Sequence, residues 1–167
     1  PLYYNFFSQL GLKVILGDGV EPEGVKLAGA SLCFPAEIAH GMFKNLLDKK
    51  TDYIFLPQVE ELYSEGNGVH GKGHQCTCVL AQSEPYYLRS AFREIDPELI
   101  SPVLNFARGW ESMEEKFIGV AKNVGVRGKR ARMAFRYGIE KQKQFHLKKK
   151  ELGENILKEI ESDPSRV

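Results

Sequence analysis

The sequence predicts an α/β fold: a small, mostly parallel sheet flanked by helices, with a helical C-terminal arm. Two patterns support this prediction. In the first part of the chain, short apolar runs alternate with segments of helical periodicity, as they do in folds built on parallel sheets. Beyond about residue 110 the pattern is helical and no further strand follows. We therefore expect an α/β core over residues 1–110, which bears the cysteines, and a helical arm over residues 111–167 packed on it.

The first helix–strand unit is expected near the N-terminus. Residues 3–10 carry apolar side chains at helical spacing, and Gly11 is the expected C-terminal stop. Residues 12–16 form a short β-branched run that ends at a Gly-Asp-Gly sequence, so they predict a strand. A helical turn over residues 23–27 and a short strand over residues 30–32 are expected next.

A second helix–strand unit follows. Pro35 suits the first turn of a helix, and apolar spacing continues that helix to about Lys49. Residues 53–56 are a continuous apolar run ended by Pro57, a pattern typical of an interior parallel strand. The polar, glycine-rich residues 58–75 predict a long loop, and loops of this length are usually functional or mobile.

The remaining elements are mostly helical. Residues 79–81 predict a strand and residues 85–93 a helix. Residues 99–104 predict an edge strand, because the run contains a proline. Helical periodicity then covers residues 113–124 and, after a glycine-rich break, residues 129–161.

The composition is that of an ordinary globular protein. The 167 residues are 43% hydrophobic and 27% charged, and no apolar run reaches the ~18 residues that a membrane helix needs. The N-terminus does not resemble a signal peptide, and three unpaired cysteines fit a reducing compartment, so a cytoplasmic location is expected. The chain opens within apparent structure, so we interpret it as a segment of a longer protein.

Charge is distributed unevenly along the chain. Residues 1–126 carry a net charge of −5, residues 127–150 a net charge of +9 and residues 151–167 a net charge of −3. The basic block could bind phosphate, in nucleic acid or in coenzyme A, or it could be a solvated helix face. Because it holds few aromatic residues, we do not expect nucleic-acid binding. We expect the arm to contact an acidic partner or a neighbouring domain, and acyl-CoA binding stays open.

The three cysteines form the candidate site. Cys33 follows a predicted strand and opens a helix, and the partial positive charge at a helix N-terminus favours a thiolate. Cys76 and Cys78 have only Thr77 between them, so they can face one metal centre. Binding sites of parallel sheets form beyond the carboxyl ends of the strands. We expect all three sulfurs to meet there.

The residues alone leave several interpretations of this site open. Buried cysteines often act only as small apolar side chains. A zinc site could combine the thiolates with His70, His74 or His40, and an iron–sulfur cluster could use the three thiolates. Spacing does not separate zinc from iron. His40 lies about two turns into the helix after Cys33, where it is a candidate proton donor or a packing histidine.

Three motifs carry a resemblance to a known family. They are residues 32–41 (Leu-Cys-Phe-Pro-Ala-Glu-Ile-Ala-His-Gly), residues 51–57 (Thr-Asp-Tyr-Ile-Phe-Leu-Pro) and residues 76–78 (Cys-Thr-Cys). With them the sequence resembles the uncharacterised domain found with the ATPase activators of 2-hydroxyacyl-CoA dehydratases, a domain that is similar to the dehydratase subunits. The likeness covers most of the chain, and residues 32–41 are its most specific part.

The resemblance implies a Rossmann-like domain with a [4Fe–4S] cluster at the carboxyl-end edge of the sheet. Cys33 and Cys78 match cluster-type positions, and Cys76 matches a cysteine that often precedes the second of them. Val79 departs from the proline that commonly follows. The implied role is a cluster-binding or cluster-derived module that supports one-electron transfer to the dehydratase, with further ligands supplied from outside this segment.

The resemblance also implies partners. They are the remaining domains of the parent protein and the activator ATPase domain. The alternative function is a zinc-bound or metal-free scaffold for that ATPase. In either case we do not expect the isolated segment to be catalytic.

Overall fold

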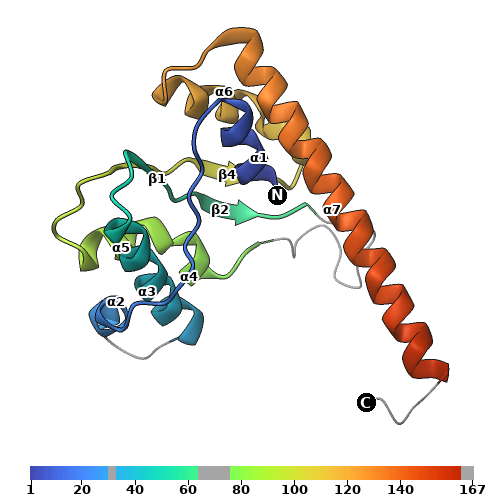
Figure 1. Ribbon diagram of the computed structural model, residues 1–167, viewed down its shortest axis with the longest axis horizontal. Coiled ribbons are helices and arrows are strands. Elements are labelled where there is room, and N and C mark those ends of the chain that lie inside the picture. The colour runs from blue at the N-terminus through green and yellow to red at the C-terminus, as the bar shows by residue number, and fades with distance from the viewer. Residues whose placement is uncertain (30–32, 64–75, 163–167) are drawn as a thin grey trace.

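The computed structural model describes residues 1–29, 33–63 and 76–162. Short parallel strands lie in the middle of the molecule and helices lie on both sides of them (Figure 1). This arrangement confirms the predicted α/β class with its long C-terminal helix. None of the helices in the described ranges is long and apolar enough to cross a membrane.

The strands form two parallel pairs. β1 (Tyr53–Phe55) pairs with β3 (Glu98–Ile100), and β2 (Gln58–Glu61) pairs with β4 (Val103–Asn105). The sequence pattern predicted a loop where β2 lies and a single edge strand where β3 and β4 lie. Both differences have one cause, since the chain stays extended on the far side of a proline in each case.

Two prolines separate the strand pairs at the same level. Phe55 lies opposite Ile100 and Gln58 lies opposite Val103, so Pro57 stands opposite Pro102. A proline has no N–H to donate to the ladder. The ladder resumes directly beyond the prolines, because the Gln58 N–H donates to the Pro102 carbonyl at 2.9 Å.

The first side of the sheet carries a core that we name the α1/α7 core. It joins α1 (Leu2–Gln9), α6 (Glu114–Asn123) and α7 (Gly128–Ser162) to the strands. Phe6, Phe117 and Phe135 are at most 1% exposed. The ring centroid of Phe117 lies 4.9 Å from that of Phe6 and 4.9 Å from that of Phe135. The expected helices over residues 3–10, 113–124 and 129–161 are therefore confirmed. The expected boundary at residue 110 stays a prediction.

Gly11 ends α1 as predicted. Its φ of +85° is the left-handed conformation that glycine adopts without a steric penalty. The Leu12 N–H donates to the Phe7 carbonyl at 3.2 Å and the Gly11 N–H to the Ser8 carbonyl at 2.9 Å, which is a Schellman motif. The motif turns the chain away from the helix axis.

The other side of the sheet carries the α3/α5 core. Helices α3 (Phe34–Asp48) and α5 (Glu84–Ala91) pack there against β1, with Phe43, Ile54 and Leu88 at most 4% exposed. These helices match the expected ones. The short α2 (Pro22–Val25) and the 3₁₀ turn η1 (Lys26–Ala28) lie beside α3 and match the expected helical turn.

Two predicted strands are wrong, and a third lies outside the described residues. Residues 12–16 pair with no strand in the described structure; they line an apolar cleft beside α1 and β1. Residues 79–81 belong to a helix, α4 (Val79–Gln82). The prediction failed because the periodicity of so short an apolar run does not distinguish a strand from a helix. The predicted strand over residues 30–32 cannot be compared, since those residues are not described.

Candidate functional site

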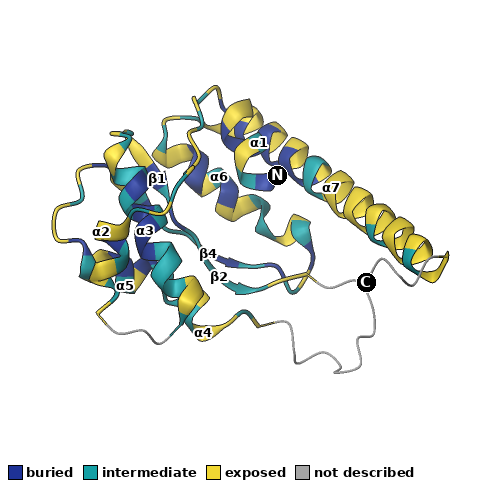
Figure 2. Ribbon diagram, turned by 60° about the horizontal axis from the view of Figure 1, so that its bottom comes forward, coloured by how far each residue is buried: buried dark blue, intermediate teal, exposed yellow. Residues whose placement is uncertain are grey.

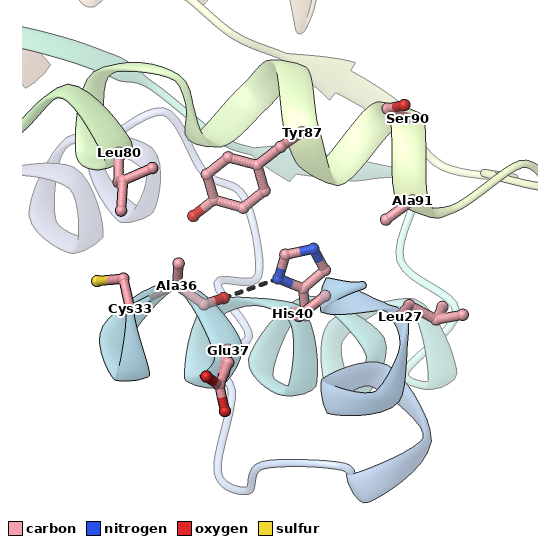
Figure 3. A pocket seen from close by; sticks show the side chains of 10 residues that line it. Leu27, Cys33, Ala36, Glu37, His40, Leu80, Tyr87, Ser90 and Ala91 are labelled. Carbon is pink, nitrogen blue, oxygen red and sulfur yellow. Dashed lines mark hydrogen bonds between the residues drawn. The ribbon is translucent and has the colours of Figure 1, made fainter. Parts of the chain in front are cut away.

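A pocket of about 440 Å³ lies between α3 and α5 (Figure 3). Apolar side chains such as Leu27 and Leu80 form part of its wall, and the polar groups of Cys33, His40 and Tyr87 converge on it. This volume is within the range of small-molecule sites, and a few polar groups in a largely apolar wall are typical of such sites.

Cys33 lies at one end of the pocket, directly before α3. Its extended backbone makes it the N-cap residue, and its carbonyl accepts a hydrogen bond from the Glu37 N–H at 3.1 Å. Pro35 follows in the first turn, as the sequence predicted. The half-buried thiol therefore sits at the N-terminus of a 15-residue helix.

The Cys76–Cys78 segment is anchored to the sheet by Thr77. The Thr77 N–H donates to the Glu60 carbonyl at 2.9 Å, its hydroxyl donates to the Val59 carbonyl, and Cys76 forms an antiparallel bridge with Glu61. The Thr77 carbonyl accepts a hydrogen bond from Gln82 Nε2 at 2.9 Å. Thr77 was not predicted to have a role, yet its hydrogen bonds fix the positions of both neighbouring cysteines.

Cys78 is exposed and starts α4, from which Leu80 reaches the pocket. Figure 3 shows Leu80 and Cys33 at the same end of the pocket. Two segments that are distant in sequence thus meet at this end.

Tyr87 of α5 is affected electrostatically by both Cys33 and Cys78. Burial raises the pKa of Tyr87 to about 12, and the negative charges of Glu84, Cys33 and Cys78 add to the increase. Both thiols therefore lie close enough to the Tyr87 phenol to act on it electrostatically. Sequence reasoning missed this residue. The only signal was its position on the inner face of a predicted helix.

His40 is a buried member of the same wall. It is 5% exposed, and its ring stacks on Tyr87 with centroids 5.0 Å apart and an interplanar angle of 16°. Its Nδ1 lies 2.7 Å from the Ala36 carbonyl, which can only accept, so Nδ1 donates. The packing interpretation of His40 is supported, and its other ring nitrogen points toward α5 (Figure 3).

Glu84, at the start of α5, interacts electrostatically with His40 and Tyr87 of the pocket wall. Burial raises the pKa of Glu84, and the nearby His40 opposes part of the increase. A carboxyl group whose pKa is raised in this way holds its proton to a higher pH than an exposed one.

The structure does not assemble a complete metal site from the residues that it describes. Within residues 1–29, 33–63 and 76–162, no group of three or more His, Cys, Asp or Glu side chains could hold a metal ion. The zinc candidates His70 and His74 lie outside the described residues. Cys33 and Cys78 both act electrostatically on Tyr87, whereas the expected meeting of all three sulfurs stays a prediction.

Comparison with known proteins gives one match. The model of the family described as the CoA enzyme activase uncharacterised domain matches residues 1–167. The chain belongs to this family. No curated protein and no solved structure matches it significantly. The match confirms the predicted relation to an activase-related domain of unknown function.

Three arginines of the basic block contact other helices of the same domain. Arg130 donates to the Leu10 carbonyl at 2.9 Å, and Arg132 and Arg136 form ion pairs of 2.8 and 2.9 Å with Glu114. These arginines hold α7 against α1 and α6. The interpretation of this block as a phosphate-binding surface is therefore left mainly with the lysines of residues 141–150.

Proposed function

We propose that this domain holds an iron–sulfur cluster at the Cys33 end of the α3–α5 pocket and supports one-electron transfer for the dehydratase system. Cys33 and Cys78 are the two principal ligands, Cys76 is the third, and other parts of the parent protein or a partner complete the set. The supporting observation is that Cys33 and Cys78 both lie near the Tyr87 phenol, from segments distant in sequence.

The donor chemistry of this site suits such a cluster. Thiolates are the usual ligands of iron–sulfur clusters, and the cluster supplies a one-electron redox centre whose potential depends on local charge, hydrogen bonds and exposure. The partial positive charge at the N-terminus of α3 would stabilise the negative charge of a cluster held at Cys33. The Tyr87 phenol provides an O–H donor near two of the sulfurs, and the stacked His40 ring holds Tyr87 in place. Cys76 and Cys78 are exposed, so a partner can approach that side.

Anaerobic reconstitution with iron and sulfide tests this proposal. The wild-type domain should gain iron, sulfide and visible charge-transfer absorption, and Cys33→Ser and Cys78→Ser should each lose most of them. Tyr86→Phe is the matched control, because Tyr86 is exposed on the same helix as Tyr87. A wild-type domain that gains no iron, or cysteine variants that gain as much as the wild type, would contradict the proposal.

A zinc-bound or metal-free scaffold for the activator ATPase is the second candidate. Among residues 1–29, 33–63 and 76–162 no three-ligand group is present, so a zinc site, like the cluster, would need ligands from elsewhere, whereas a metal-free scaffold would not. Metal analysis of protein purified in air separates the two functions, because structural zinc persists while an exposed cluster is lost. Stoichiometric zinc, or no metal together with tight binding to the ATPase domain, would support the scaffold.

A further inference from the structure

The two halves of α7 have different surroundings. The first half packs on α1 and α6, with Ala131, Phe135 and Gly138 buried. From residue 143 to residue 162 no side chain is buried, and this half projects from the body of the domain (Figures 1 and 2). We name residues 143–162 the α7 tail. At 1.5 Å per residue it is about 30 Å long.

The α7 tail carries an apolar stripe. Its residues are Phe145, Leu152, Ile156 and Ile160, spaced at i, i+7, i+11 and i+15, so they share roughly a quarter of the helix circumference. Phe145 is 44% exposed, Leu152 is 59% and Ile156 is 47%. A stripe with this period is the seam along which two helices pack, and a single helix cannot bury it.

Charge along this half of the helix reverses near the middle of the stripe. Residues 141–150 contain five lysines and no acidic residue, whereas residues 151–162 contain four glutamates and one lysine. The helix macrodipole does not explain this order, because it favours cations at the C-terminal end. The last turn of α7 contains no basic residue. This order of lysines followed by glutamates would be stabilised by opposite charges on a partner outside the helix.

A second copy of the same helix provides that compensation when it runs antiparallel. The stripe is centred between Leu152 and Gly153, and the charge changes sign between Lys150 and Glu151, so the two midpoints nearly coincide. A two-fold axis at this point sets Phe145 level with the partner's Ile160 at both ends of the seam, sets Leu152 beside the axis, and places each basic half beside an acidic half. Isologous interfaces need this self-complementarity. A parallel pair would place lysines beside lysines.

The described part of the body contacts the tail only at its N-terminal end, where Lys143 pairs with Glu111 at 2.6 Å and His146 lies against Trp110. With the axis at residues 152–153, the end of the partner's tail reaches the level of residue 143 and therefore adjoins this contact. Gly153 has no neighbouring atom within 4 Å of a Cβ built on it, so the helices can approach closely at the axis.

We propose that the α7 tail is a homodimer interface in which two copies of the domain pair their tails antiparallel through this stripe. The partner is thus a second copy of this chain. This interface is independent of any cluster at Cys33, since the tail shares no residue with the pocket.

The first test compares two leucines on opposite faces of the tail. Leu152 lies in the stripe and Leu147 lies on the opposite face, and they are 59% and 69% exposed. Sedimentation equilibrium of the wild-type chain should show a monomer–dimer equilibrium. Leu152→Gln should weaken it at least about tenfold, because each dimer loses two buried leucines. Leu147→Gln should leave it unchanged.

The second test reverses charge in each half. One variant combines Lys148→Glu, Lys149→Glu and Lys150→Glu, and the other combines Glu151→Lys, Glu154→Lys and Glu161→Lys. Each should be monomeric alone, because its tail then carries a net charge of −5 or +7 and repels a second copy, and an equimolar mixture should form a heterodimer.

Three results would overturn the interface. They are a wild-type chain that stays monomeric at every concentration, a Leu152→Gln variant that dimerises as the wild type does, and reversed variants that do not associate when mixed. Circular dichroism of each variant identifies any loss of helix, which these exposed positions are not expected to cause.

Discussion

The two sides of the sheet are built differently. The α1/α7 core consists of tightly packed apolar side chains with three fully buried phenylalanines at its centre. The α3/α5 core is smaller and borders a pocket of about 440 Å³. The buried polar side chains of the described residues, His40 and Asn45, both belong to α3. One side therefore provides most of the stability, and the other holds the groups that can do chemistry.

The largest expected effect is the loss of a central ring from the α1/α7 core. Phe135→Ala should lower the free energy of unfolding by about 3–5 kcal/mol, because it removes a large side chain that is 1% exposed and leaves a cavity. The control is Met133→Ala on the same helix, where the side chain is 60% exposed and the change should stay within about 0.5 kcal/mol. Urea titration measures both. If Phe135→Ala and Met133→Ala lowered the free energy of unfolding equally, the α1/α7 core would not be the main source of stability.

A matched pair of glycines tests both sides at once. A Cβ on Gly138 would lie 3.0 Å from the Leu2 carbonyl oxygen, and one on Gly41 would lie 2.4 Å from a Val20 methyl and 3.0 Å from the Glu21 carbonyl oxygen. Gly138→Ala and Gly41→Ala should each cost about 1–3 kcal/mol through overpacking. Gly119→Ala is the control, because a Cβ there meets nothing within 4 Å. Thermal unfolding should show that it is neutral or stabilising by up to about 1 kcal/mol.

Those substitutions also separate stability from the site. Gly41→Ala acts beside His40 and should increase the alkylation rate of Cys33 in the native state. Gly138→Ala should not, because Gly138 lies on the other side of the sheet. A uniform increase in both variants would mean that the two sides are not independent.

The smallest expected effect concerns the ion pairs between α6 and α7. Arg136 and Arg132 hold the pKa of Glu114 below its usual 4.5. The pairs therefore stabilise the fold above that pH, and the contribution is lost as the pH falls through the lowered pKa of Glu114. Glu114→Gln should cost about 0.2–1 kcal/mol at pH 7, since exposed pairs are weak, and progressively less as the pH falls through the lowered pKa of Glu114. Glu115→Gln, at a longer 3.5 Å contact, should cost less.

The sequence predicted the helices better than the strands. Apolar spacing and terminal Gly or Pro residues located α1, α3, α5, α6 and α7, because these signals are local. The run at residues 12–16 has the composition of a strand, but whether it pairs depends on a neighbour that the local pattern does not specify. Pro57 was interpreted as a strand end, although the ladder continues beyond it.

The candidate site was only partly predictable for the same reason. Cys33 was recognisable because Pro35 and the helical spacing after it are local. The approach of Cys78 to Tyr87 depends on how Thr77 fixes its segment to β2 and on how α5 packs, and neither is visible in the spacing of the cysteines. Thr77 and Tyr87 were missed because their contacts are tertiary.

The opposed prolines of the sheet also bear on solubility. Short strands with exposed edges are templates on which foreign strands can add, and natural proteins interrupt such edges with residues that cannot donate a hydrogen bond. Pro57 and Pro102 divide each extended run into segments of three or four residues. A foreign strand adding along the β1–β2 edge would meet a missing donor at Pro57, because the Leu56 and Gln58 N–H groups on either side of it point inward to Ile100 and Pro102.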